Sequence, residues 1–80
     1  METNEENVSR NIKAKRVQMG LKQEEIASML NITKPTYLNI ENHPFNVSIT
    51  KLLQVAECLN CTLNEFFLPI QFTKSESEEK

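Results

Sequence analysis

The stretch from residue 23 to residue 41, QEEIASMLNITKPTYLNIE, has the pattern of two short helices joined by a tight turn. Ile26, Ala27 and Leu30 recur at helical spacing and predict one apolar helix face. Asn31 interrupts this pattern with a residue that tolerates the left-handed backbone conformation, which predicts a helix end. A small residue such as Ala27 lets two helices approach closely enough for a connection of about three to four residues.

The second helix of this pair is predicted to begin near Thr33, whose hydroxyl is a suitable N-cap. Pro35 fits a first helical turn because a backbone N–H there would have no helical partner. Tyr37 and Ile40 then supply a second apolar face, and both are expected to lie in the core. The middle of the chain therefore predicts a helix-turn-helix unit.

Residues of this unit occur at the spacing of a known family: Gln23, Ala27, Asn31, Ile32, Thr33, Ile40 and Glu41, with Arg16 and Gly20 upstream. From about residue 8 to residue 67 the chain resembles the phage repressor and Cro-like (XRE-type) helix-turn-helix transcriptional regulators. The resemblance implies an all-α fold of five helices that binds DNA. It also implies an ion pair between Arg16 and Glu41 that joins the first helix to the third.

Length and composition are those of one small globular domain: 80 residues, of which 39% are hydrophobic and 25% charged. No apolar run approaches the roughly 20 residues of a membrane span, and the acidic start lacks a signal-peptide core, which favours a cytoplasmic protein.

The sequence contains no paired acid and base, nucleophile constellation or glycine-rich phosphate loop, so neither an enzyme nor a cofactor is expected.

Cys58 and Cys61 form a C-x-x-C pair, but a structural zinc site needs four ligands. The single histidine, His43, is predicted to lie on a different loop, and there is no second cysteine pair. We therefore expect no metal and predict that both thiols are buried.

The net charge of −2 is unevenly distributed. Residues 10–34 contain six cations and only two acids, Glu24 and Glu25, an excess of four positive charges, whereas six of the eleven acids lie near the two ends. A phosphate backbone responds to the local field of one face and not to the sum over the chain. The charge distribution is therefore compatible with a nucleic-acid partner.

The domain organisation predicted from the sequence is a flexible N-terminus (residues 1–7), a helix-turn-helix domain (8–68) and a C-terminal extension (69–80). The first helix is predicted over residues 8–19, with Met19 in its apolar pattern and Gly20 as its left-handed stop. Lys22 occupies the N-cap position of the second helix, which predicts a weaker helix start. Asn42 is predicted to provide a left-handed stop after the third helix.

Two further helices are predicted after residue 47. Ser48 is a suitable cap for a helix over residues 49–59, and Thr62 with Glu65 has the capping-box pattern for a short last helix. The core face predicted for the fourth helix consists of Ile49, Leu52, Leu53, Ala56 and Leu59.

The resemblance implies a role for individual side chains on DNA. The implied base-contacting residues are Lys34, Pro35, Thr36, Leu38 and Asn39. The implied phosphate-contacting residues are Gln23 and Asn42, to which Lys13, Lys15 and Lys22 are added as further candidates. Asn39 is suited to adenine, Lys34 to guanine or a phosphate, and the apolar side chains to a thymine methyl group.

The last apolar residues are Phe66, Phe67, Leu68, Ile70 and Phe72, more than a domain this small is expected to bury. Either the segment folds back over its own core or it forms a homodimer interface; we predict the homodimer, with residues 69–73 contributing and 74–80 disordered. The predicted function is a repressor that binds duplex DNA at a near-palindromic operator. The alternative is an antitoxin or a restriction-modification controller whose main partner is another protein, such as a toxin.

Overall fold

The protein was analysed as a computed structural model, which describes residues 4–68. Its helices are α1 (Glu5–Gln18), α2 (Gln23–Met29), α3 (Lys34–Asn42), α4 (Ile49–Cys58) and α5 (Leu63–Phe66), with a 3-10 turn, η1 (Pro44–Asn46), between α3 and α4. The predicted all-α class is confirmed, since residues 4–68 contain five α-helices and no strand. None of these helices has the length and apolar character needed to span a membrane.

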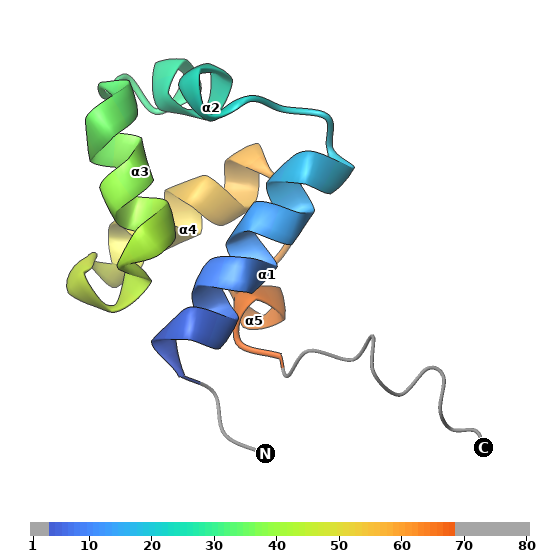
Figure 1. The fold of residues 1–80 in the computed structure, drawn as a ribbon. Coiled ribbons are helices and arrows are strands. Elements are labelled where there is room, and N and C mark those ends of the chain that lie inside the picture. The colour runs from blue at the N-terminus through green and yellow to red at the C-terminus, as the bar shows by residue number, and fades with distance from the viewer. Residues whose placement is uncertain (1–3, 69–80) are drawn as a thin grey trace.

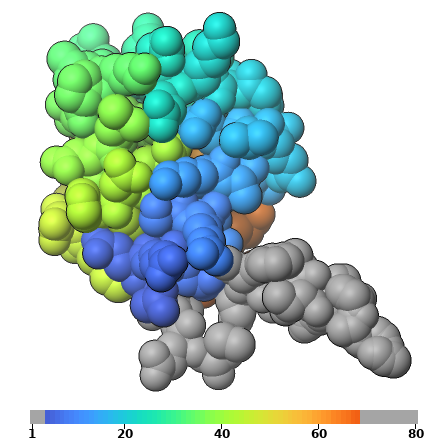
Figure 2. Space-filling model, in the orientation of Figure 1, coloured from blue at the N-terminus to red at the C-terminus, as the bar shows by residue number. Residues whose placement is uncertain are grey.

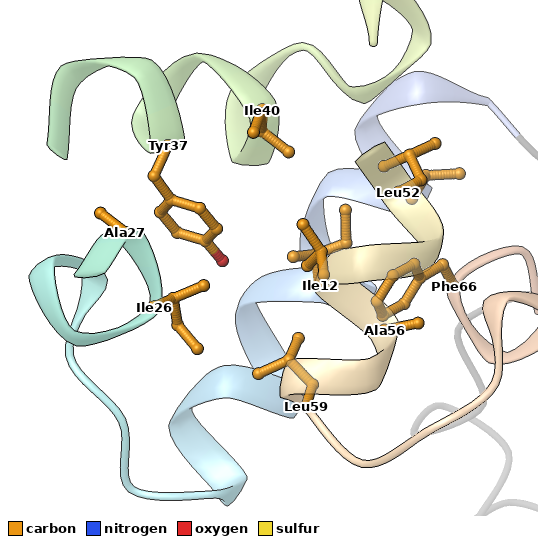
Figure 3. Packing of buried hydrophobic residues seen from close by; sticks show 11 residues of the cluster. Ile12, Ile26, Ala27, Tyr37, Ile40, Leu52, Ala56, Leu59 and Phe66 are labelled. Carbon is orange, nitrogen blue, oxygen red and sulfur yellow. The ribbon is translucent and has the colours of Figure 1, made fainter. Parts of the chain in front are cut away.

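The helices enclose one hydrophobic core, to which all five contribute. Figure 1 shows α2 and α3 meeting at one corner of the molecule, with α1 crossing in front of α4 and with α5 below. In Figure 3 the ring of Tyr37 points from α3 toward Ile26 of α2, and Phe66 of α5 lies against Ala56 of α4. Tyr37 and Ile40 are buried, as the sequence predicted. The fully or nearly fully buried apolar residues are Val8, Ile12, Ile26, Ala27, Tyr37, Ile40, Leu52, Val55, Ala56, Leu59 and Phe66.

The same Schellman motif ends α1, α2 and α4. Gly20, Asn31 and Asn60 have positive φ angles of 73°, 61° and 57°. After each of them the next amide donates back into the helix: Leu21 N to Arg16 O at 3.1 Å, Ile32 N to Ala27 O at 2.9 Å, and Cys61 N to Ala56 O at 3.0 Å. Each motif turns the chain sharply and returns Leu21, Ile32 or Cys61 to the core. The sequence predicted the first two stops and missed Asn60.

The helix starts are fixed by side chains that accept backbone N–H groups. Thr33 and Ser48 cap α3 and α4 as predicted, accepting from Thr36 N at 3.3 Å and from Lys51 N at 3.1 Å. The Glu25 carboxylate accepts the Lys22 amide at 2.7 Å, which compensates for a Lys22 side chain that cannot accept a hydrogen bond.

The start of α1 differs from the prediction. The Asn4 side chain accepts the amide of Asn7 at 2.8 Å, and the helix begins at Glu5 instead of residue 8. The carboxylates of Glu5 and Glu6, in this first turn, stabilise the helix because they interact favourably with the positive end of its dipole. Residues 4–7 are therefore helix cap and helix, and the remainder of the predicted flexible segment, residues 1–3, lies outside the described residues.

The predicted left-handed stop at Asn42 is wrong. Asn42 is the last residue of α3, and the helical hydrogen bond from His43 N to Asn39 O, 2.8 Å long, carries the helix through it. His43, at φ −134° and ψ 60°, leaves the helix and leads directly into η1 at Pro44. The proline ends the helix by itself, because it has no N–H to donate to the next turn.

The core face of α4 is rotated relative to the predicted one. Leu52 and Ala56 are buried as predicted, but Val55 takes the place expected for Ile49 and Leu53, which are 56% and 44% exposed. The sequence could not distinguish the two faces because both contain apolar residues at intervals of three and four. Met19, which belonged to the predicted apolar pattern of α1, is the C-cap residue of that helix and is exposed.

Phe66 was predicted to belong to a dimer interface, but it is 1% exposed and lies in the core of its own chain. The backbone around it is fixed to α1 by two asparagines: Asn11 Nδ2 donates to Phe66 O at 2.8 Å and to Leu68 O at 2.7 Å. Asn7 Nδ2 donates to Leu68 O at 3.0 Å. These bonds hold α5 against α1 and seat the phenyl ring between α4 and α1.

The rest of the predicted dimer segment has a different environment. Phe67 is half-buried and packs against the core, whereas Leu68 is exposed. Ile70 and Phe72, together with the predicted disordered tail at 74–80, lie outside the described residues.

Two neighbouring leucines test the rotation of α4. Leu52→Ala should lower the free energy of unfolding by about 2–5 kcal/mol, because it opens a cavity in the core. Leu53→Ala removes the same atoms from an exposed site and should cost less than about 1 kcal/mol. Urea denaturation of both variants measures the difference; equal costs would contradict the observed α4 face.

Candidate nucleic-acid interface

The outer side of α3 is largely exposed. Its buried side consists of Tyr37, Ile40 and Glu41. The five side chains predicted to contact bases lie outside this buried side, with Leu38 half-buried and the others exposed: Lys34, Pro35, Thr36, Leu38 and Asn39. Figure 2 shows α3, in green, forming an edge of the molecule. The fold therefore presents these residues together on one outward-facing helix.

A buried carboxylate holds α3 in this orientation. Glu41 is completely buried and accepts hydrogen bonds from Arg16 Nε at 2.7 Å, Gln23 Nε2 at 3.0 Å and Tyr37 Oη at 2.8 Å. Arg16 also donates from Nη1 to Leu21 O at 2.9 Å. Burial and the adjacent Glu41 carboxylate raise the pKa of Tyr37 far above its usual value, so its hydroxyl stays protonated and donates. The ion pair between Arg16 and Glu41 thus joins α1 to α3, and Gln23 adds α2.

Gln23, implied by the resemblance to contact a phosphate, has a structural contact in this molecule. Its side chain is half-buried, and one of its two amide N–H groups is engaged by Glu41. Only the second amide N–H remains for another acceptor. Asn42, Lys13 and Lys22, the other candidates besides Lys15, are exposed.

The local excess of positive charge is mostly engaged in ion pairs within the protein. The pairs are Arg10 with Glu6 at 3.3 Å, Lys15 with Glu65 at 3.3 Å, Arg16 with Glu41 at 2.7 Å and Lys34 with Glu24 at 3.8 Å. Of the six cations at residues 10–34, only Lys13 and Lys22 have no carboxylate at ion-pair distance within the described chain. The field of this face is therefore weaker than the sequence suggested.

Among the residues predicted to contact phosphates, Lys15 has the environment that differs most from the prediction. Its ammonium pairs with Glu65 of α5, so its charge is directed to an element outside the helix-turn-helix. The pKa of Glu65 is lowered by a hydrogen bond from the Thr62 backbone amide and by the Lys15 ammonium. Lys15 therefore contributes to the packing of α1 on α5.

The pair of Lys34 and Glu24 lies across the tight turn, between the first turns of α2 and α3. Both side chains are largely exposed, at 47% and 61%. The pKa of Glu24 is lowered by a hydrogen bond to its own backbone amide and by the charges of Lys34 and Lys22. The carboxylate is therefore ionised beside a residue predicted to contact bases.

A shallow hollow of about 280 Å³ adjoins the other end of α3. Thr36, Asn39 and Ile40 form its wall on α3. The opposite side is made by residues after that helix: His43, Asn46, Val47, Ser48 and Lys51. From the sequence, Ser48 was predicted only to cap a helix, and no role was predicted for Lys51. No local signal identifies these residues, because they follow α3 in the chain and meet Asn39 only in the folded structure.

Within residues 4–68, the C-x-x-C pair belongs to no cluster of side chains that could bind a metal ion. Cys58 and Cys61 are free thiols and half-buried, so they are less buried than predicted. Burial and the neighbouring Glu57 and Glu65 carboxylates raise the pKa of Cys58 and Cys61, respectively, which keeps both thiols protonated. Residues 4–68 contain no group of three or more histidine, cysteine or acidic side chains that could hold a metal ion.

Comparison with known proteins places this geometry in a family. The model of the helix-turn-helix family matches residues 12–66, from the middle of α1 to the end of α5. The chain belongs to the helix-turn-helix family. The family match supports the general function of a DNA-binding transcriptional regulator for this protein.

The fold is also that of a solved structure. The crystal structure of the hypothetical transcription factor NHTF from Neisseria superposes with a TM-score of 0.74 at 20% sequence identity. The similarity covers 95% of this chain and 92% of that one. No curated protein matches the sequence. At this identity the superposition supports the arrangement of the helices.

Removing the charge of Glu41 tests the buried connection. Glu41→Gln should lower the free energy of unfolding by about 3–5 kcal/mol, because it leaves the Arg16 guanidinium without a counter-charge in a buried site. Glu57→Gln, the same change at an exposed site of α4, should stay within about 0.5 kcal/mol of the unaltered protein. Thermal and urea denaturation provide the comparison, and similar stabilities for the two variants would count against a structural role for Glu41.

Proposed function

We propose that the protein is a sequence-specific repressor that binds duplex DNA as a homodimer, with α3 inserted in the major groove. The observation that carries this proposal is the outward face of α3, which no other described element covers and which the Glu41 contacts hold in place. An α-helix fits the width of the major groove, where each base pair presents a distinct pattern of donors and acceptors.

The side chains of α3 suit direct reading of bases. The exposed Asn39 amide can donate to and accept from the N7 and N6 edge of an adenine. Lys34 can donate to the O6 and N7 atoms of a guanine, and Pro35 or Leu38 can contact a thymine methyl group. Thr36 lies beside Asn39 in the hollow and can donate to either a base or the backbone.

The surroundings of α3 suit contacts to the sugar-phosphate backbone. Ser48 and Lys51, on the far side of the hollow from Asn39, supply a hydroxyl and an ammonium. Asn42 at the end of α3 and Lys22 before α2 supply exposed donors elsewhere on the same unit. Such contacts fix the orientation of the protein on the duplex without reading its sequence.

Dimerisation is part of the proposal because one small domain reads few bases. Support comes from large exposed apolar side chains: Ile49 and Leu53 on α4, and Leu68 at 49% exposure after α5. A two-fold dimer would place two copies of α3 about one helical turn, roughly 34 Å, apart on a near-palindromic site. A dimer of this size represses most simply by occupying promoter DNA.

The reading of adenine is tested with duplexes enriched from a random pool by the unaltered protein. Asn39→Ala should weaken binding to an enriched duplex by about 1–3 kcal/mol and relax the preference at one base pair of each half-site. Asn64→Ala, at an exposed asparagine of α5, should leave binding unchanged. Fluorescence titration and a repeated selection measure both effects; an unchanged base preference would contradict the role of Asn39.

The oligomeric state is tested by sedimentation of the protein alone and with an enriched duplex. The expected result is two chains for each duplex and half-sites with centres about 10–10.5 base pairs apart. A single chain at saturation, over a single unrepeated half-site, would exclude the homodimer.

A further inference from the structure

The ion pair of Glu24 and Lys34 lies on the surface of the helix-turn-helix unit. Both side chains are largely exposed, and the nitrogen and oxygen atoms are 3.8 Å apart. Exposed pairs of this kind contribute little to the free energy of folding. Yet the pair places a carboxylate beside the first residue of the helix proposed to enter DNA, where it opposes the approach of phosphates.

The chemistry of the lysine suggests what the carboxylate does. An ammonium on a flexible four-carbon stem has three N–H donors and can reach many acceptors. Without a partner, Lys34 would pair with any phosphate within its reach on any duplex. The charge attraction of Glu24, at 3.8 Å, holds the ammonium near the start of α3, and its N–H donors remain available for a base.

We infer that Glu24 is a positioning residue for DNA recognition, which holds the Lys34 ammonium toward base edges and withdraws it from non-specific phosphate contacts. The inference rests on the proposed function. A guanine correctly placed in the groove is contacted while the ion pair persists. A phosphate of an unrelated sequence is reached only after the pair has broken, so Glu24 weakens non-specific binding more than specific binding.

The neighbouring Glu25 makes it possible to distinguish the positioning of Lys34 from general repulsion between a carboxylate and DNA. Glu25 carries the same charge in the same helical turn, but its carboxylate accepts the Lys22 amide at 2.7 Å and makes no ion pair with Lys34. Glutamine preserves that hydrogen bond, since its side-chain oxygen also accepts. Glu25→Gln is therefore a matched control for Glu24→Gln.

The experiment measures the affinity of the unaltered protein and both variants for two probes over a series of salt concentrations. One probe is a duplex enriched from a random pool by the unaltered protein, and the other is a shuffled duplex of the same composition. Glu25→Gln should raise both affinities by the same factor. Glu24→Gln should raise the affinity for the shuffled duplex by a further factor of about two to five, the range that one exposed ion pair supplies.

Salt dependence gives a second measurement on the shuffled duplex. Because Lys34 would then neutralise one more phosphate, the slope of log K against log salt should become steeper by about 0.9 for Glu24→Gln than for Glu25→Gln. In a Lys34→Met background this difference between the two variants should disappear.

Three outcomes overturn the inference. Equal effects of Glu24→Gln and Glu25→Gln on both probes, or a difference that persists in Lys34→Met, would refute the positioning role and leave the proposed DNA binding intact. Failure of the unaltered protein to enrich any duplex, or to prefer it to the shuffled one, would overturn the inference and the proposed function together.

Discussion

The arrangement of this domain depends on one buried carboxylate. An ionised side chain without solvent is tolerated only when its charge and its hydrogen-bonding capacity are satisfied by the protein. Glu41 meets this requirement with donors from three places, namely Arg16 of α1, Gln23 of α2 and Tyr37 of its own helix. Because each donor is geometrically specific, the carboxylate fixes how α3 sits against α1 and α2, and therefore which side of α3 faces outward.

Most of the cations at residues 10–34 are already paired with carboxylates of the same domain. Four of the six cations at residues 10–34 are engaged by carboxylates within the domain, including Lys34 at the start of α3. Electrostatic attraction supplies essentially all of the non-specific affinity of a protein for DNA. The pairing of these cations therefore reduces the charge available for non-specific attraction to phosphates.

The sequence predicted those features that arise within a few residues of chain. Gly20 and Asn31 mark helix ends because few other residues adopt positive φ, and Thr33 and Ser48 mark helix starts because their hydroxyls reach amides three residues on. The outward side chains of α3 were implied by the resemblance to helix-turn-helix regulators. Three errors depend on distant contacts: the α4 face, the burial of Phe66 and the partner of Lys15. The Asn4 cap of α1, the stop at Asn60 and the helix end at Asn42 are local features that the prediction missed.

The sequence by itself thus determined the order of the helices, the tight turn between α2 and α3, and the residues available on α3, since helix periodicity and capping are local properties. The tertiary structure decided which apolar residues are buried and which charges are paired. Phe66 fills the core because Asn11 of α1 holds its backbone carbonyl, 55 residues away in the chain. Glu24 meets Lys34 only because the two helices pack against each other, and contacts of this kind have no signature in the spacing of residues.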